Sequence, residues 1–385
     1  MSLRPWLELL RVSALFTVPG DALAGAAATG LRPHRGTAYA VGASLCLYEA
    51  GMALNDWADR EEDARERPHR PIPSGRVGAG AALGASVVLT GAGLGLASRA
   101  GRGPLAVAAA LAATVWSYDL VLKRTPVGPG AMAAARSLDL LLGAVATGPG
   151  VSRALTPAAM LGAHTYAVTT VSRHETQGGS VRAPLLALAA AGVISAAAAR
   201  SRVPNPAPSR NWGLRPADPH RGSAPDPAPQ SPEGLRGASQ ARPAIEDKRP
   251  KVAYGVQGRS PASGGRGLAP VQPTPGQGVW GAAPHAAEPQ MSQPGRGGIG
   301  ELLRAAATPA ALAAVSYLAT AATPYLHAAL NPSPPLTQRA VGGGIRAMIP
   351  LQAALSARAG ATGTAAALTA LVPLARKLAR KVSPT

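Results

Sequence analysis

Long apolar runs, separated by short charged clusters, set the strongest limit on how this chain can fold. Runs of Ala, Leu, Val and Gly alternate with clusters of Arg, Asp and Pro, and many approach the roughly 20 residues that cross a bilayer as a helix. Of the 385 residues, 46% are hydrophobic and only 15% are charged, whereas about a quarter are charged in soluble domains. The runs lack the alternation of membrane β-strands. The sequence therefore predicts an all-α, polytopic membrane bundle of about nine transmembrane helices around a central cavity.

The apolar runs divide the chain into two groups of predicted helices. The predicted spans are residues 14–29, 37–54, 77–98, 104–122, 128–147, 156–171, 183–199, 302–330 and 361–378. A moderately apolar stretch, 340–355, is either a tenth span or a half-buried helix. Residues 1–200 thus hold the first seven transmembrane helices, and residues 301–385 hold the C-terminal ones.

Residues 201–300 have a different composition. They are rich in Pro, Gly, Ser, Gln and Arg and carry no helical or strand period. This composition predicts a disordered insertion between two spans. Two interpretations remain open for it, a tolerated insertion without function and a segment that binds a partner or an anionic surface.

The net charge of +19 comes mainly from arginine. In a soluble protein this charge would suggest nucleic acid, but here much of it lies in short loops between apolar runs, where the positive-inside rule explains it. We expect a bilayer and no nucleic acid as the partner. Three arginine- or lysine-rich loops, 55–76, 123–124 and 172–182, alternate with less basic ones. They and the N-terminus are expected on the cytoplasmic side of a multi-pass plasma membrane protein.

Two further features narrow the class of protein. The single cysteine, Cys46, rules out an internal disulfide, a Cys-rich zinc site and an iron–sulfur cluster. Arg4 and Arg11 precede the first apolar run, and no small-residue cleavage pattern leads into a soluble domain. We therefore expect a retained first span and not a removed signal peptide.

The loop after the second predicted span carries three aspartates with helical spacing. Asp56, Asp59 and Asp63 are three and then four residues apart, so on a helix they share one face. Their carboxylates repel one another unless a cation lies among them, and Mg²⁺ commonly bridges carboxylates to substrate phosphates. The alternative is a solvated acidic helix start. Arg67 and Arg70, which follow in a proline-rich stretch, would add charge-assisted contacts to phosphate and favour a diphosphate site.

The pattern Asn-Asp-x-x-Asp-x-x-x-Asp, followed by Arg-Pro-x-Arg-Pro-Ile-Pro-Ser-Gly, resembles the first aspartate-rich motif of the UbiA superfamily. The members of this superfamily are intramembrane prenyltransferases, which move a prenyl group from a prenyl diphosphate to an acceptor. The resemblance is to members similar to 4-hydroxybenzoate polyprenyltransferase. The resemblance implies substrate contacts for Asn55, at the start of the motif. Tyr118 and Lys123 match the Tyr-x-x-x-Leu-Lys element that ends the fourth helix of the family, which implies that Lys123 contacts the diphosphate. A simple cytoplasmic anchor is the alternative for Lys123.

The second aspartate-rich motif of the family is thinned in this chain. The corresponding loop contains Arg173, His174 and Glu175, and Glu175 is its only carboxylate. The resemblance implies that Glu175 completes the metal site and that Arg173 assists in binding the diphosphate. His174 could assist Glu175, and the alternative is a histidine that is merely solvated in the loop.

Several ionisable residues lie within the predicted spans. Asp21 is a candidate for lining the acceptor pocket, and Glu49 is a candidate for accepting a proton or a hydrogen bond from the acceptor, because acids at this depth pair with another group or serve function. For both, a buried polar contact between helices is the alternative. Arg136 and Asp139 are three residues apart and either form a structural ion pair or serve function. His164 is expected to have a packing or hydrogen-bonding role.

Together these features predict a Mg²⁺-dependent prenyltransferase. Mg²⁺ would be held by Asp56, Asp59, Asp63 and Glu175, with Lys123 as a further catalytic residue, and the partners would be a prenyl diphosphate and an acceptor whose identity is not readable. One alternative is a non-enzymatic isoprenoid-binding or transport-accessory protein on the same scaffold. A metal-dependent phosphotransferase that uses a CDP-linked alcohol is a further alternative, but its Asp-Gly motif is not found.

Overall fold

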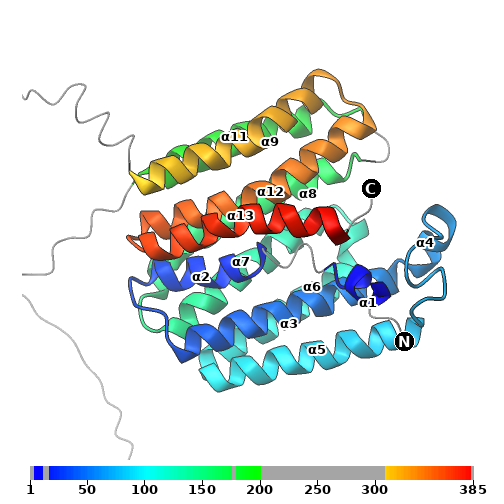
Figure 1. The fold of residues 1–385 in the computed structure, drawn as a ribbon, viewed down its shortest axis with the longest axis horizontal. Helices are drawn as coiled ribbons and strands as arrows, with labels where there is room; N and C mark the ends of the chain where they lie inside the picture. The colour runs from blue at the N-terminus through cyan, green and yellow to red at the C-terminus, as the bar shows by residue number, and fades with distance from the viewer. Residues whose placement is uncertain (1–3, 12–16, 176–178, 201–307, 383–385) are drawn as a thin grey trace, which may run out of the picture. The chain divides into compact units, whose positions relative to one another are not determined.

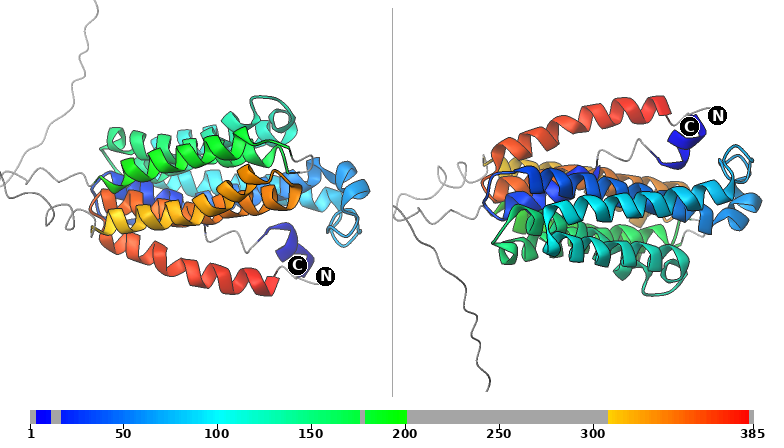
Figure 2. Two further views of the ribbon diagram at one scale, coloured as in Figure 1. Left: turned by 90° about the horizontal axis from the view of Figure 1, so that it is seen from above. Right: turned by 90° about the horizontal axis from the view of Figure 1, so that it is seen from below.

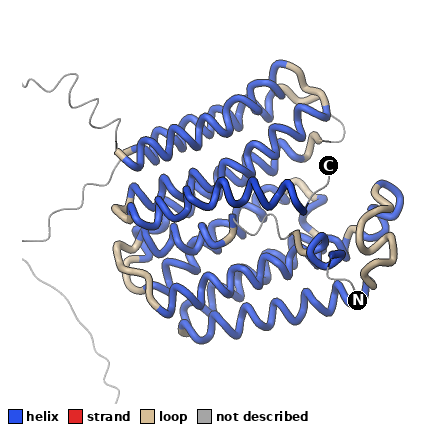
Figure 3. The backbone as a smooth tube through the Cα atoms, viewed as in Figure 1, coloured by secondary structure: helices blue, strands red, loops and turns tan. Residues whose placement is uncertain are grey.

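All regular structure in the described residues is helical. The structure is a computed structural model that describes residues 4–11, 17–175, 179–200 and 308–382, and these contain helices without strands (Figures 1 and 3). The chain divides into two units, residues 1–207 with 295–385, and residues 208–294. The second unit, and the whole of the predicted insertion 201–300 with it, lies outside the described residues. The prediction of an all-α bundle is confirmed.

Each predicted span overlaps one helix. The helices are α1 (Arg4–Leu9), α2 (Pro19–Ala28), α3 (Arg35–Ala58), α4 (Arg60–Glu66), α5 (Ala79–Ala100), α6 (Arg102–Leu120), the 3-10 helix η2 (Leu122–Arg124), α7 (Gly128–Thr147), α8 (Val151–Ser172), α9 (Arg182–Ala199), α11 (Pro309–Leu330), α12 (Pro334–Arg358) and α13 (Thr362–Val382). The stretch 340–355 is part of α12, and most of its side chains are buried.

Among the described residues, three helices are long and apolar enough to cross a membrane, by length and composition. They are α5, α7 and α9, and α5 and α9 expose several large apolar side chains, including Val88 and Val193. About nine spans therefore stays a prediction, although the helical membrane class is supported.

The long helices pack side by side within the first unit. Among the neighbouring pairs are α3 with α5, α7 with α8, α2 with α7, and α11 with both α9 and α12 (Figure 2). Thus α12, at the C-terminal end, lies beside α2, at the N-terminal end. The largest buried apolar cluster joins side chains from both halves, such as Leu140, Leu161, Tyr317 and Leu351.

Two glycines let α2 and α7 approach at backbone contact. A Cβ added to Gly143 would overlap the backbone of Ala22, and one added to Gly25 would overlap the carbonyl of Leu140. Small residues at helix interfaces permit such close packing in membrane proteins. The interface between α2 and α7 therefore depends on both glycines.

A buried polar cluster connects α2, α3, α7 and α12. The Asp21 carboxylate lies 2.8 Å from the Arg136 guanidinium and accepts a hydrogen bond of 2.6 Å from Gln352, and its side chain is fully buried. Ser44 donates to Asp139 over 2.7 Å. Arg136 thus pairs with Asp21 on another helix, and no ion pair between Arg136 and Asp139 occurs in the described part. This arrangement matches the polar contact between helices that was the alternative for Asp21.

His164 is also held between helices. One ring nitrogen lies 3.0 Å from the carbonyl of Gly344 and the other lies 3.0 Å from the Tyr317 hydroxyl. The two rings meet edge to face, with centroids 5.2 Å apart. These contacts support the packing role that was considered for His164.

Replacing Gly143 with alanine is expected to destabilise the bundle. The added methyl group overlaps the backbone of α2, and such overpacking costs about 1–3 kcal/mol. Thermal denaturation of the detergent-purified protein measures the effect. Gly130→Ala, on the same helix with no atom near the added Cβ, is the control and should leave the melting temperature unchanged or slightly raised. Equal melting temperatures for the two variants would contradict the close approach.

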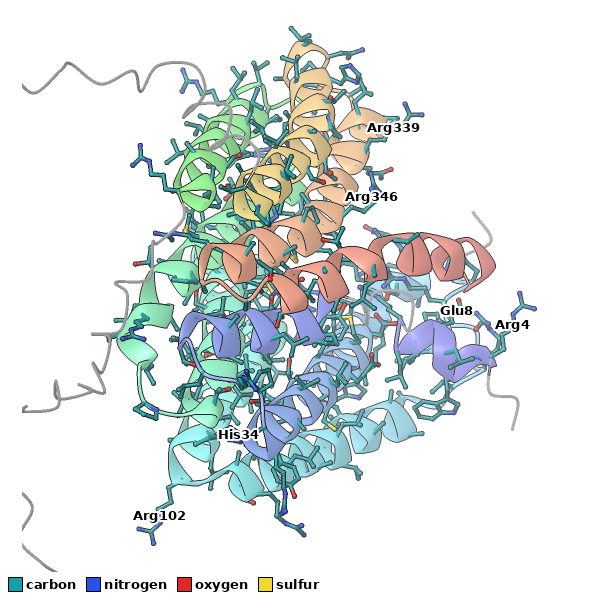
Figure 4. The ribbon with its side chains drawn as sticks, turned by 60° about the vertical axis from the view of Figure 1, so that its left-hand side comes forward. Arg4, Glu8, His34, Arg102, Arg339 and Arg346 are labelled. Carbon is teal, nitrogen blue, oxygen red and sulfur yellow. The ribbon has the colours of Figure 1, made fainter. Side chains whose placement is uncertain are left out.

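Replacing Arg136 with glutamine is expected to lower the melting temperature markedly. The change leaves the buried Asp21 carboxylate without its counter-charge, and breaking a buried ion pair by removing one partner costs about 3–5 kcal/mol. Arg346→Gln, which changes an exposed arginine of α12 (Figure 4), should have little effect in the same measurement. A double variant, Arg136→Gln with Asp21→Asn, should recover part of the loss, and a further large loss would argue against the pairing.

Candidate functional site

The three predicted metal ligands lie where α3 ends and α4 begins. Asp56 belongs to the last turn of α3, Asp59 closes that helix, and Asp63 lies within α4. Backbone hydrogen bonds from Asp59 to Asn55 and from Asp63 to Asp59 continue across the junction. The helical spacing is therefore kept, but the side chains divide into two groups: Asp56 with Asp63, and Asp59 alone.

One guanidinium bridges Asp56 and Asp63. The same nitrogen of Arg70 lies 2.6 Å from the Asp63 carboxylate and 3.6 Å from that of Asp56. Both carboxylates are buried, with 5% and 7% of their side chains exposed. A positive charge between them offsets the repulsion that two buried carboxylates would otherwise exert. The pair therefore already accommodates one cation.

The turn that follows the short helix α1 contributes an arginine that the sequence analysis did not assign to the site. Arg11 donates a hydrogen bond of 3.0 Å to Asp56. Glu8, labelled on α1 in Figure 4, forms a two-bond ion pair with Arg76 at 2.7 and 3.2 Å, and Leu9 packs in an apolar cluster with Ala53 and Val77. These contacts hold Arg11 beside Asp56 although 45 residues separate the two in sequence.

The third aspartate faces the end of the α6 segment. Lys123 lies 2.5 Å from Asp59, and Arg124 lies 3.5 Å from the same oxygen. Arg124 also pairs with Glu62 at 2.8 Å. The Tyr-x-x-x-Leu-Lys element is thus brought to the first aspartate-rich loop, and the contact of Lys123 with a diphosphate stays a prediction.

Asp119 is a second site residue that sequence reasoning missed. It is buried and accepts a hydrogen bond of 3.0 Å from Asn55. Its position one residue after Tyr118 and four before Lys123 was the available signal, since residues four apart share a helix face. Asp119, Lys123, Trp57 and Arg60 are among the residues that line a pocket of about 170 Å³ at this end of α3 and α6. Tyr118 is half-buried and lies close enough to Asp59 and Arg173 to be affected by their charges.

The loop that contains Glu175 meets the first aspartate-rich loop at Arg67. Burial raises the pKa of the Glu175 carboxyl, and the neighbouring Arg67 guanidinium lowers it. Arg67 also lies 3.8 Å from Asp63, so it stands between the two loops. Arg173 donates a hydrogen bond to the carbonyl of Thr125, in the loop after η2. All three loops that were expected on one side are therefore adjacent.

The donor set is suited to a cation held between two carboxylates. Among the described residues, no three side chains of His, Cys, Asp or Glu lie close enough together to hold a metal ion. Asp56 and Asp63 nevertheless share a cationic nitrogen, and oxygen ligands of this kind suit Mg²⁺. Asp56 and Asp63 could therefore supply two oxygen ligands to one cation. The other two predicted ligands, Asp59 and Glu175, lie against Lys123 and Arg67.

Glu49 differs from the other intramembrane acid. Both of its carboxylate oxygens are buried, and neither has a hydrogen-bond partner in the part of the chain that the structure describes. Only 8% of the residue is exposed. The alternative considered for Glu49, a buried polar contact between helices, is thus not observed there, whereas it is observed for Asp21.

Comparisons with known proteins agree with the motif. Residues 13–190 match the model of the UbiA prenyltransferase family. Digeranylgeranylglyceryl phosphate synthase of Methanopyrus kandleri is 36% identical over 130 residues, which cover 32% of this chain and 46% of that protein. The protein of the same name from Ignicoccus hospitalis is 39% identical over 139 residues, covering 35% and 44%. The chain thus spans less than half the length of these two relatives.

Two solved structures are also similar in part. A structure described as giving insights into the biosynthesis of digeranylgeranylglyceryl phosphate synthase in membranes aligns with a TM-score of 0.41 at 20% identity, over 50% of this chain and 75% of that one. The apo structure of a UbiA homolog from Aeropyrum pernix K1 aligns with a TM-score of 0.41 at 21% identity, over 48% and 75%. Residues 13–190, which hold both aspartate-motif loops, are thus similar to the UbiA prenyltransferase family.

Proposed function

We propose that this protein is a Mg²⁺-dependent prenyltransferase that moves a prenyl group from a prenyl diphosphate to an acceptor within the membrane. The observation that carries the proposal is the pair Asp56 and Asp63, two buried carboxylates that share one cation and are surrounded by Arg11, Arg67 and Arg70. Such a surplus of basic side chains around acids suits a ligand that is both metal-bound and anionic.

The basic residues would exchange partners when the substrate binds. Each of Arg11, Arg70 and Lys123 lies against an aspartate in the protein alone. A bound Mg²⁺, held by Asp56 and Asp63, would neutralise charge on the diphosphate and so stabilise it as a leaving group. The guanidinium and ammonium groups are then free to turn to the remaining phosphate oxygens. Asp59 and Glu175 complete the acidic side of the proposed site, with Arg173 and Tyr118 at its edge.

We propose that the acceptor is a glyceryl phosphate that carries a free hydroxyl group. The support is the name shared by the two relatives described above, digeranylgeranylglyceryl phosphate synthase. The site end of the bundle and the N-terminus are proposed to face the cytoplasm of a plasma membrane, because Arg and Lys gather in the loops at this end.

The non-enzymatic alternative is a protein that binds a prenyl diphosphate and does not turn it over. It is favoured by the single carboxylate of the second loop, Glu175, and by the lack of three converging metal ligands in the described residues. Release of pyrophosphate separates the two functions.

Replacing Asp63 with asparagine is expected to lower Mg²⁺-dependent pyrophosphate release by about 100-fold or more, a loss typical of removing one group that stabilises the transition-state charge. The measurement uses the full chain in detergent with a panel of prenyl diphosphates and pooled glyceryl phosphate and aromatic acceptors. Removal of Mg²⁺ with a chelator should abolish release, and added Mg²⁺ should restore it.

The matched control is Glu61→Gln, which changes an acid of the same helix whose side chain is 81% exposed. It should release pyrophosphate like the wild type. Tight Mg²⁺-dependent binding of prenyl diphosphate without release from any member of the panel would replace the enzyme proposal with the non-enzymatic one.

A further inference from the structure

Glu49 is a buried acid with no hydrogen-bond partner at either carboxylate oxygen among the described residues. Asp21 has Arg136 and Gln352, Asp139 has Ser44 at one of its oxygens, and Asp56 has Arg11 and Arg70. Only 8% of the Glu49 residue is exposed. A buried polar group without a hydrogen bond is unfavourable by a few kcal/mol, so a ligand that donates a hydrogen bond would stabilise it.

The position of Glu49 points to the proposed site. It lies seven residues before Asp56 on α3, which is two helical turns, so both side chains are on the same face about 10 Å apart along the axis. Asp56 marks the end of that face where the diphosphate would bind. Glu49 lies deeper among the apolar residues, on the side toward which a prenyl tail would extend.

The separation of the two acids leaves room for a substrate between them. A metal–ligand bond of about 2 Å, an attacking oxygen about 3–3.5 Å from the ester carbon and a hydrogen bond of about 3 Å together span about 8 Å, so the path through the diphosphate would have to bend between the two acids. An acceptor hydroxyl on such a bent path would lie between the ester carbon and the Glu49 carboxylate. Asp21, which was the other candidate for the acceptor pocket, is already occupied by Arg136 and Gln352.

We infer that Glu49 is the general base that removes the proton from a hydroxyl-bearing acceptor. This inference rests on the proposed function. In the step, the bond between the allylic carbon and the diphosphate oxygen breaks, and its electron pair leaves with pyrophosphate. The acceptor oxygen forms a bond to that carbon and becomes an ether, and its proton passes to the Glu49 carboxylate. The prenyl diphosphate, the hydroxyl compound and ionised Glu49 give the ether, pyrophosphate and protonated Glu49, so atoms and charges balance.

The test compares Glu49→Gln with Glu66→Gln in the purified full chain. Glutamine keeps the shape of the side chain and cannot take the proton, and Glu66 is an exposed acid of α4 that serves as the control. The substrates are geranylgeranyl diphosphate with Mg²⁺ and a glyceryl phosphate that has one prenyl ether and one free hydroxyl. For Glu49→Gln, we expect kcat for ether formation to fall by about 10²–10⁴-fold, the usual contribution of a general base, and the KM for the diphosphate to stay near its wild-type value.

A second measurement follows the carbon–oxygen bond without the acceptor. In geranylgeranyl diphosphate labelled with ¹⁸O at the bridging position, reversible ionisation moves the label to non-bridging positions. Glu49→Gln should still exchange the label at a rate close to wild type, because ionisation needs the diphosphate site and not the base. A merely structural role of Glu49 would slow both the exchange and ether formation.

The outcomes separate this inference from the proposed function. Ether formation by Glu49→Gln at the wild-type rate, or equal loss of label exchange and ether formation, would overturn the role of Glu49 while the transferase stands. Transfer only to a ring carbon of an aromatic acceptor would overturn the hydroxyl class. If Glu49→Gln does not fold, Glu49→Asp keeps the carboxylate and should retain label exchange with a lowered kcat, and an unchanged kcat would count against the base. If the wild-type protein releases no pyrophosphate, the proposed function is wrong, and the role of Glu49 as a base is wrong with it.

Discussion

The ion pair between Asp21 and Arg136 is the contact on which the central helices depend. It joins α2 to α7, and Gln352 extends the contact to α12. Ser44 connects α3 to the neighbouring Asp139 of α7. Because an unpaired charge among apolar side chains is strongly unfavourable, these helices have one arrangement in which the buried charges are paired. The glycines at the interface between α2 and α7 make that arrangement sterically possible.

The polar contacts of α3 determine where the candidate site lies. The helix is held by Ser44 in its first half and by the hydrogen bond from Asn55 to Asp119 near its end. The aspartates that follow are therefore presented at a fixed end of the bundle. There, each of Asp56, Asp59 and Asp63 lies against a basic side chain, so binding of the proposed diphosphate would exchange charged partners and would not fill an uncompensated acidic cluster.

The sequence predicted the helices well because hydropathy is a local property. The predicted span 128–147 coincides with α7, 77–98 differs from α5 by two residues at each end, and 183–199 differs from α9 by one residue at its start. The extent of α12 was not predictable from hydropathy, since Gln338, Arg339 and Arg346 interrupt its apolar run. Its burial comes from contacts with helices distant in sequence.

The candidate site was predictable where a motif carried it and not where it depends on tertiary contacts. The aspartate spacing and the Tyr-x-x-x-Leu-Lys element identified Asp56, Asp63 and Lys123. Arg11 and Asp119 contact the motif across 45 and 64 residues of sequence. The spacing of Asp119 from Lys123 was a local signal for the one, whereas no local pattern indicates the contact of Arg11. The division of the three aspartates between Arg70 and Lys123 likewise depends on how the loops fold back.

The participation of α12 in the polar cluster has a consequence for biosynthesis. Gln352 and Met348 contact Asp21 and Arg136 across 331 and 212 residues of the chain. The ribosome completes the N-terminal helices long before α12 emerges, and N-terminal parts of a chain generally begin to fold first. The early helices therefore have an incomplete set of polar contacts until α12, more than 300 residues after Asp21, joins them.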